Sequence, residues 1–165
     1  MVAAMFLVSA IPAKAGNLRF EVQAVKKKLG SEKSDSSSTQ TRQEEWGYEV
    51  TVTNRSFQDV SGLKAEYIVF MKDAKPGSTE RPTLVRTKAS QDLGALQNGR
   101  CFTFQTKPME LTKTQLKGGW VWGSGADPRS TDRLSGIWVR IYKDGQVVAD
   151  SSIPTSLSSQ EPWEK

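Results

Sequence analysis

Apolar and polar residues alternate in several separate segments of this chain, and this two-residue period restricts the fold more than any other feature. "NLRFEVQAV" (17–25) and "EWGYEVTVTN" (45–54) each place large apolar residues on one face and polar residues on the other. The alternation returns in "LKAEYIVFMK" (63–72), "RCFTFQTK" (100–107) and "LSGIWVRIYKDGQVVADSS" (134–152). No segment repeats apolar residues at helical spacing over three turns. The sequence therefore predicts an all-β protein.

The number of these segments favours an antiparallel β-sandwich. Asp144-Gly145 is a signal for a type I′ turn, so the last segment is expected to be a hairpin. A weaker strand is expected at 83–88, and one short helical turn at 109–119. This gives about seven strands, as in an immunoglobulin-like domain, with an eight-stranded jelly roll as the main alternative. Cys101 is the only cysteine, so no intramolecular disulfide can form and the fibronectin-type variant of the fold is expected. Its thiol is expected to be buried.

The N-terminal stretch "MVAAMFLVSAIPAKAGN" has the pattern of a secretory signal peptide. An apolar run from Val2 to Ile11 is followed by Ala13-Lys14-Ala15, which fits an A-x-A cleavage site. The run is shorter than the roughly 20 apolar residues of a membrane-spanning helix, and no later stretch is long and apolar enough to be one. We therefore expect residues 1–15 to be a signal peptide and 16–165 an exported domain, located in the periplasm or at the cell surface.

Two polar segments interrupt the alternation. "GSEKSDSSSTQTRQ" (30–43) contains no apolar residue and is expected to be a long mobile loop. Lys26, Lys27 and Lys28 form the only run of consecutive basic residues, at the end of the first expected strand. We interpret this run as a guard against edge-to-edge pairing.

The sequence contains no recognisable catalytic set. There is no histidine, which excludes serine and cysteine triads of the histidine type. No phosphate-binding loop of the G-x-x-x-x-G-K type occurs. Glu44 and Glu45 are adjacent, so they should point to opposite faces of a strand, a poor geometry for the facing carboxylates of glycoside hydrolysis. We expect no enzyme activity and no cofactor.

The charge of the chain likewise predicts no specific partner. The chain has 23 Lys and Arg residues, 18 Asp and Glu residues and a formal net charge of +5, spread along its length. A nucleic-acid surface normally shows a stronger basic excess with stacking aromatics, so no nucleic-acid partner is expected. Asp127 and Asp132 flank one short polar segment and are weak candidates for a calcium site, although the EF-hand spacing is absent. Alanine variants at these two residues would also test the remaining possibility of an unusual hydrolase.

Tryptophans are the strongest candidates for ligand or partner contact. Trp120 and Trp122 lie in "KGGWVWGSGADPRS" (117–130), where glycines surround them. They would share one face of an extended strand, and packing on the sheet is favoured over exposure, because paired exposed tryptophans are uncommon in monomers. The glycines are interpreted as bends of a crossing between the two sheets. Trp163 is a further candidate contact, whereas Trp46 and Trp138 are assigned to the sandwich.

Four motifs carry a resemblance to a known group of proteins: "WGYEVTVTNRS", "VSGLKAEYIVF", "LGALQNGRCFTFQT" and "LSGIWVRIYKDGQVVADSS". Together with the signal peptide, the chain resembles the small exported immunoglobulin-like proteins of gut and environmental bacteria, one of which is encoded beside type IV pilus-like components. The resemblance extends over nearly all of the mature chain. It implies a periplasmic or cell-surface protein with an interaction role and no established activity.

Two functional hypotheses follow. The first is an exported, non-catalytic protein-interaction or structural module of the cell envelope or surface, associated with a pilus-type assembly through strand or loop contacts to an unidentified envelope protein. The second is a carbohydrate-binding module in which Trp120, Trp122 and Trp163 stack on a glycan.

Overall fold

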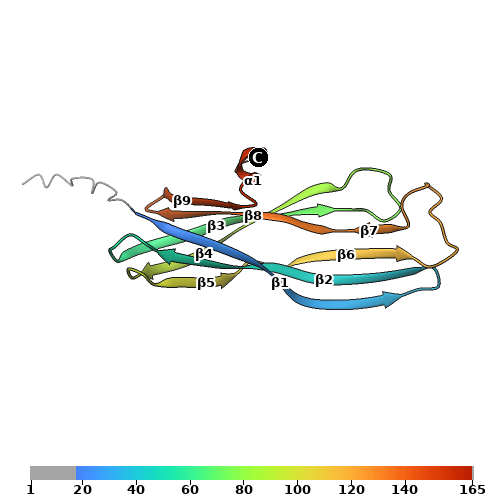
Figure 1. Cartoon of the computed structure of the whole chain (residues 1–165), viewed down its shortest axis with the longest axis horizontal. Helices are drawn as coiled ribbons and strands as arrows, with labels where there is room; N and C mark the ends of the chain where they lie inside the picture. Colours follow the sequence, from blue (N-terminus) through green and yellow to red (C-terminus); the bar gives the residue numbers. More distant parts are fainter. Residues whose placement is uncertain (1–17, 165) are drawn as a thin grey trace, which may run out of the picture.

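The computed structural model describes residues 18–164 and consists of two antiparallel sheets packed face to face (Figure 1). The predicted signal peptide lies outside these residues. The elements are β1 (Phe20–Asp35), β2 (Thr39–Asn54), β3 (Val60–Asp73), β4 (Thr83–Leu96), β5 (Cys101–Gln105), β6 (Met109–Leu116), β7 (Arg129–Thr131), β8 (Arg133–Lys143), β9 (Gln146–Ile153) and the short helix α1 (Leu157–Gln160).

The two sheets are called sheet A and sheet B. Sheet A has five strands in the order β1-β2-β6-β7, with β5 beside the half of β2 that β6 leaves free. Sheet B has four strands in the order β4-β3-β8-β9. The all-β, two-sheet antiparallel sandwich without a disulfide is thereby confirmed, with nine strands in the described part of the chain instead of about seven. Cys101 is exposed and not packed as predicted.

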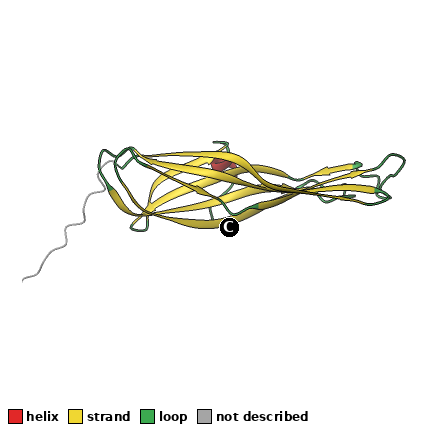
Figure 2. Cartoon of the chain, turned by 90° about the horizontal axis from the view of Figure 1, so that it is seen from below, coloured by secondary structure: helices red, strands yellow, loops and turns green. Residues whose placement is uncertain are grey.

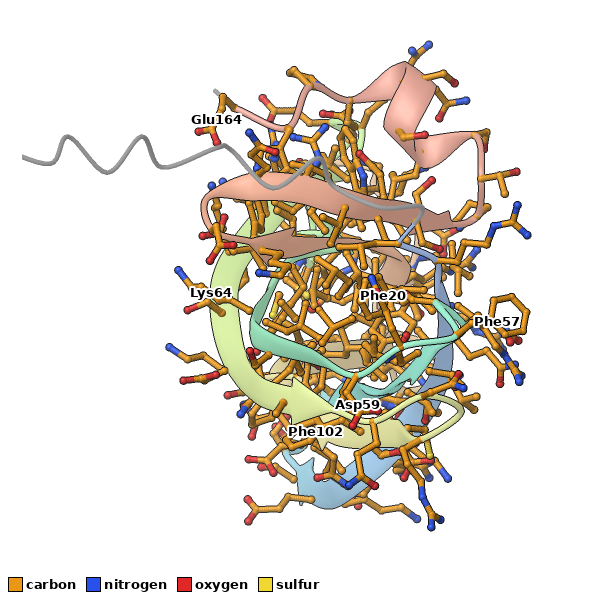
Figure 3. The ribbon with its side chains drawn as sticks, turned by 90° about the vertical axis from the view of Figure 1, so that its left-hand side faces the viewer. Phe20, Phe57, Asp59, Lys64, Phe102 and Glu164 are labelled. Atoms are coloured by element: carbon orange, nitrogen blue, oxygen red, sulfur yellow. The ribbon has the colours of Figure 1, made fainter. Side chains whose placement is uncertain are left out.

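The core lies between the sheets and is built by the alternating apolar residues. Tyr48, Val50 and Val52 of β2 are almost fully buried and meet the inner face of sheet B, which includes Val69 and Val139. Burial of each such side chain contributes about 1.5–3 kcal/mol. Figure 3 shows side chains filling the space between the two sheets. The period-two pattern thus fixes which face of each strand enters the core.

Sheet A continues well beyond this core as a distal arm, which comprises residues 30–45 and 112–131. Figure 1 shows β1, β2 and β6 running past β5 toward one end, and Figure 2 shows the molecule tapering there. The predicted mobile loop at 30–43 is therefore wrong, because β1 and β2 pair as far as Asp35↔Gln40 around a short turn. Backbone hydrogen bonds form this ladder whatever the polarity of the side chains.

The expected helical turn at 109–119 is also wrong, because this segment is strand β6 as far as Leu116. The following loop, 117–128, also differs from its interpretation as a crossing between the sheets. It joins β6 to β7 within sheet A. After β7 the chain crosses to sheet B at Asp132, whose Oδ2 accepts the Thr112 N–H at 2.8 Å and whose Oδ1 accepts the Ala74 N–H at 2.8 Å. This carboxylate ties β6 of sheet A to the β3–β4 loop of sheet B.

Sheet B is covered on its outer face as well. Trp163 of the C-terminal segment packs edge-on against Trp138, with ring centroids 5.1 Å apart and planes at 82°. Together with Ile68, Phe70 and Leu157 they form a second apolar cluster. β3 lies between β4 and β8 and is buried on both faces, since Tyr67 and Val69 face the core and Ile68 and Phe70 face this cluster, all with 3% exposure or less.

β1 forms one edge of sheet A and is interrupted by a bulge at Leu29, between Lys28↔Trp46 and Gly30↔Glu45. The bulge separates the part of β1 that covers the core from the part that belongs to the arm. At the opposite end of the molecule Phe57 projects from the β2–β3 loop with 86% of its surface exposed (Figure 3). Within residues 18–164 there is no helix of the length and apolarity needed to cross a membrane.

Candidate basic cleft and exposed loop of the distal arm

The inner face of β2 changes from apolar to charged where the arm begins. Even-numbered residues of β2 share the core face, since the strand is regular along its length. On this face the core residues Val52, Val50 and Tyr48 are followed by Trp46 and then by Glu44, Arg42 and Gln40. The adjacent residues of the arm follow the same register, with Lys33 and Lys113 on either side of Arg42. The arm therefore carries cations where the body carries its core.

These residues line a cavity of about 230 Å³, which we call the basic cleft. Its lining comes from four strands and consists of Lys33, Gln40, Arg42, Lys113, Thr114, Gln115, Arg129 and Thr131. Four of these eight side chains are cationic and none is acidic. The others present amide or hydroxyl groups that donate and accept hydrogen bonds.

A second cavity of about 340 Å³ adjoins the basic cleft and shares Lys113 and Thr131 with it. It lies toward the core and is lined by Lys26, Glu44, Trp46, Leu111, Lys113, Thr131, Asp132, Arg133 and Leu134. Trp46 is half-buried, so its indole forms part of the cavity wall. The two cavities therefore make one hollow along β2 and β6, and its second part carries the carboxylates of Glu44 and Asp132 beside its cations.

Glu44 lies between the two cavities with a side chain only 4% exposed. Its carboxylate accepts hydrogen bonds from Lys113 Nζ at 2.8 Å, Lys28 Nζ at 2.9 Å and Trp46 Nε1 at 2.9 Å. These three donors lower the pKa of Glu44 to about 2. The carboxylate therefore stays ionised and holds both lysines against the arm. Glu45 is exposed on the other face, so the prediction that the two acids point in opposite directions is confirmed.

Lys33 and Arg129 differ from these lysines because they have no acidic partner within 4 Å among residues 18–164. Both are exposed at the open side of the basic cleft. Arg42 has only a long contact to Glu44, with 3.9 Å between Nη1 and Oε1. The cleft therefore holds positive charge that the protein itself does not neutralise.

The opposite face of the arm has the opposite sign. Glu32, Glu45 and Glu110 lie there, and Glu110 Oε1 accepts a hydrogen bond from Gln43 Nε2 at 2.8 Å. The run of three lysines is divided in the same way, because Lys27 pairs with Glu49 on the outer face, whereas Lys28 points inward to Glu44. Cations thus predominate on the inner face and acids on the outer face, although Glu44 and, by register, Asp35 are acids of the inner face.

The loop 117–128 lies at the tip of the arm and separates the two tryptophans predicted to share a face. Trp120 is 56% exposed and Val121 85% exposed. Trp122 is half-buried against Gly77 of the β3–β4 loop, and Ser124 Oγ donates to the Gly77 carbonyl at 2.6 Å. Gly77 has φ +72° and no room for a larger side chain beside the indole. The predicted packing is therefore confirmed for Trp122 and wrong for Trp120.

The remaining predicted contact residues are occupied elsewhere. Trp163 is 7% exposed beneath the charged side chain of Arg140, which lies 4.4 Å from its ring centroid. Asp127 Oδ1 accepts the Arg129 N–H at 2.8 Å, and both oxygens of Asp132 accept backbone N–H groups. No group of three or more His, Cys, Asp or Glu side chains within 18–164 could hold a metal ion.

Comparisons with known proteins add little to this geometry. No protein-family model and no curated protein sequence matches the chain. It is similar in structure to an X-ray structure of a structural genomics target, with 10% identity and a TM-score of 0.34 over 73% of this chain and 84% of that one. It is also similar to a protein from Akkermansia muciniphila, with 14% identity and a TM-score of 0.26 over 84% and 73%. Both TM-scores are below 0.5, so neither likeness supports a functional argument.

Proposed function

We propose that this protein is an exported, non-catalytic interaction module of the cell envelope or surface, and that the distal arm is its contact end. The observation that carries the proposal is the tip of the arm, where Trp120 and Val121 are exposed side by side at the end of a sheet extension. Large exposed apolar side chains are costly to leave in water and dominate the energy of protein interfaces. The expected partner is an envelope or surface protein.

The proposal includes an immunoglobulin-like assignment of the sandwich. The order β4-β3-β8-β9 corresponds to the C′-C-F-G sheet of that fold, and β1, β2 and β5 with β6 correspond to its A, B and E strands. Domains of this kind commonly bind through the loops at one end. Association with a pilus-type assembly rests on the sequence resemblance alone.

Co-sedimentation with isolated envelopes of the producing organism tests the proposal. The variant Trp120→Ser with Val121→Ser should reduce binding at least about fivefold, because it removes the apolar contact surface. Phe57→Ser is the control, since Phe57 is a large apolar side chain, 86% exposed, that lies at the opposite end of the molecule. Equal binding by wild type and the tip variant, or an equal loss in the control, would contradict the assignment of the arm.

Carbohydrate binding is the second candidate, favoured by the indole of Trp120, which is 56% exposed and of a kind that stacks on sugar rings. Tryptophan fluorescence titrated with mucin-type glycans and neutral polysaccharides is the direct measurement. A saturable shift that disappears in Trp120→Leu would support stacking at the tip. If no glycan changes the emission, this candidate is excluded.

A further inference from the structure

We propose that the basic cleft is a binding site for an anionic polysaccharide, whose carboxylate or sulfate groups contact Lys33, Arg42 and Arg129. This assignment goes beyond the interaction role of the tip, because the cleft and the exposed loop are separate surfaces of the arm. It stands on the charge, shape and backbone arrangement of the cleft.

Charge is the first argument. Four cations surround a cavity of about 230 Å³, and Lys33 and Arg129 have no acidic partner in the described part of the chain. Side chains of alternating charge would keep the protein equally soluble and would also form cross-strand ion pairs. The region instead places Glu32, Glu45 and Glu110 on the opposite face, and the inner-face carboxylate of Glu44 is bonded to Lys28 and Lys113 and not to Lys33 or Arg129. An anion in the cleft would relieve the mutual repulsion of its cations.

Shape is the second argument. The cleft is smaller than the cavities of roughly 300–1,000 Å³ that enclose drug-sized ligands, but it continues into the second cavity through Lys113 and Thr131. The hollow follows the strand direction, with Lys26 and Arg133 in the second cavity; its two carboxylates, Glu44 and Asp132, are engaged by lysines and by backbone N–H groups. An extended chain with a charge on successive units fits this hollow better than a single compact anion.

The lining chemistry distinguishes among polyanions. The amides of Gln40 and Gln115 and the hydroxyl of Thr131 suit sugar hydroxyls, and Trp46 offers an indole to a ring in the second cavity. An acidic peptide would be recognised through backbone pairing, but β2 and β6 already have a neighbouring strand on both sides here. Single-stranded nucleic acid would require a series of stacking aromatics, and the two cavities contain one.

A pair of charge-matched double variants tests the site. Lys33→Gln with Arg129→Gln removes the two unpaired cations of the cleft without breaking an ion pair. Arg100→Gln with Lys107→Gln removes the same charges from exposed positions outside it. Binding is measured by isothermal titration calorimetry at low and moderate salt. The probes are polygalacturonate, dextran sulfate, neutral dextran, polyglutamate, polyphosphate and oligo-dT.

We expect wild type to bind polygalacturonate, dextran sulfate or both, more weakly as salt rises, and not neutral dextran. The cleft variant should bind about tenfold more weakly, whereas the control should stay within about twofold of wild type. The two acidic polymers identify the charged group as carboxylate or sulfate.

Three results would overturn the proposal: equal loss in both double variants, equal binding of neutral dextran, or tighter binding of polyglutamate, polyphosphate or oligo-dT than of either acidic polysaccharide. The tip variant separates this inference from the proposed function. Trp120→Ser with Val121→Ser should keep polysaccharide binding, and the cleft variant should keep the tip contact.

Discussion

The two halves of β2 pair with their neighbouring strands in the same way, but the inner face is apolar and buried in one half and charged in the other. From Tyr48 to Asn54 the inner residues are buried to 2% exposure or less. From Thr39 to Glu45 the same face carries Arg42 and Gln40, although the strand still pairs on both sides. Strand pairing alone therefore sets the backbone conformation of the arm. Packing against sheet B decides which side chains the inner face of β2 can carry. The following predictions test this comparison.

The largest effect is expected from an acid placed on the inner face of the two halves in turn. Val50→Asp puts a carboxylate at a fully buried position without a partner and should destabilise the fold by more than about 4 kcal/mol. Gln40→Asp, ten residues away on the same face, should change stability by less than about 0.5 kcal/mol. Urea denaturation followed by circular dichroism compares them. Similar losses in the two variants would mean that the arm is part of the core.

The second largest effect is expected at Asp132, which links sheet A to sheet B. Asp132→Ala removes the acceptor of the Thr112 and Ala74 N–H groups, which are partly buried, and should cost about 2–4 kcal/mol. Amide hydrogen exchange should accelerate at Thr112 and Ala74 and stay unchanged at Val50. Equal acceleration at all three amides would mean that the substitution destabilises the whole fold and not only the contact between the sheets.

A smaller effect is expected at Glu44, where the two halves meet. Its pKa is about 2 in the folded protein and 4.5 without its partners, so its stabilisation is fully present above pH 4.5 and is lost as pH falls toward 2. Glu44→Gln should lower stability by about 1–2 kcal/mol at pH 7, because Lys28 and Lys113 are partly exposed and screened.

The pH dependence provides the control for this variant. Denaturation curves of wild type and Glu44→Gln should converge between pH 4.5 and pH 2, since protonation removes the same charge from wild type. A difference that stays constant over this range would show that the ionised carboxylate is not the source of the stabilisation.

The smallest effect is expected at the open side of the cleft. Lys33→Gln and Arg129→Gln remove cations that have no acidic partner within 18–164, so thermal unfolding should show a change of less than about 0.5 kcal/mol, in the stabilising direction. A loss above 1 kcal/mol in either variant would show that the residue serves the fold, and binding data on it would then need a second variant.

The fold of the body could be predicted from the sequence because burial leaves a periodic apolar signal. β2, β3 and the β8–β9 hairpin are recognisable in this way, and Asp144 and Gly145 do form the turn, with φ of 50° and 77°. The opposite directions of Glu44 and Glu45 follow from the same period. Residues 39–45 are all polar, so the extension of β2 into the arm leaves no such signal in the sequence.

The basic cleft could not be predicted in the same way. Its cations at 33, 42, 113 and 129 come from four strands and meet only through the pairing register, which no local period encodes. The separation of Trp120 from Trp122 likewise depends on Gly77, a residue more than forty positions earlier in another loop. Sites built across strands require the partner of each strand to be known.

The bulge at Leu29 affects what happens when many copies of this chain meet at high concentration. β1 is a sixteen-residue edge, and an uninterrupted edge of that length would be a template for fibre growth. The extra residue bends and twists the edge near its middle, so neither half presents a long, flat row of free backbone groups. A long arm can therefore be carried without turning the molecule into a seed for polymerisation.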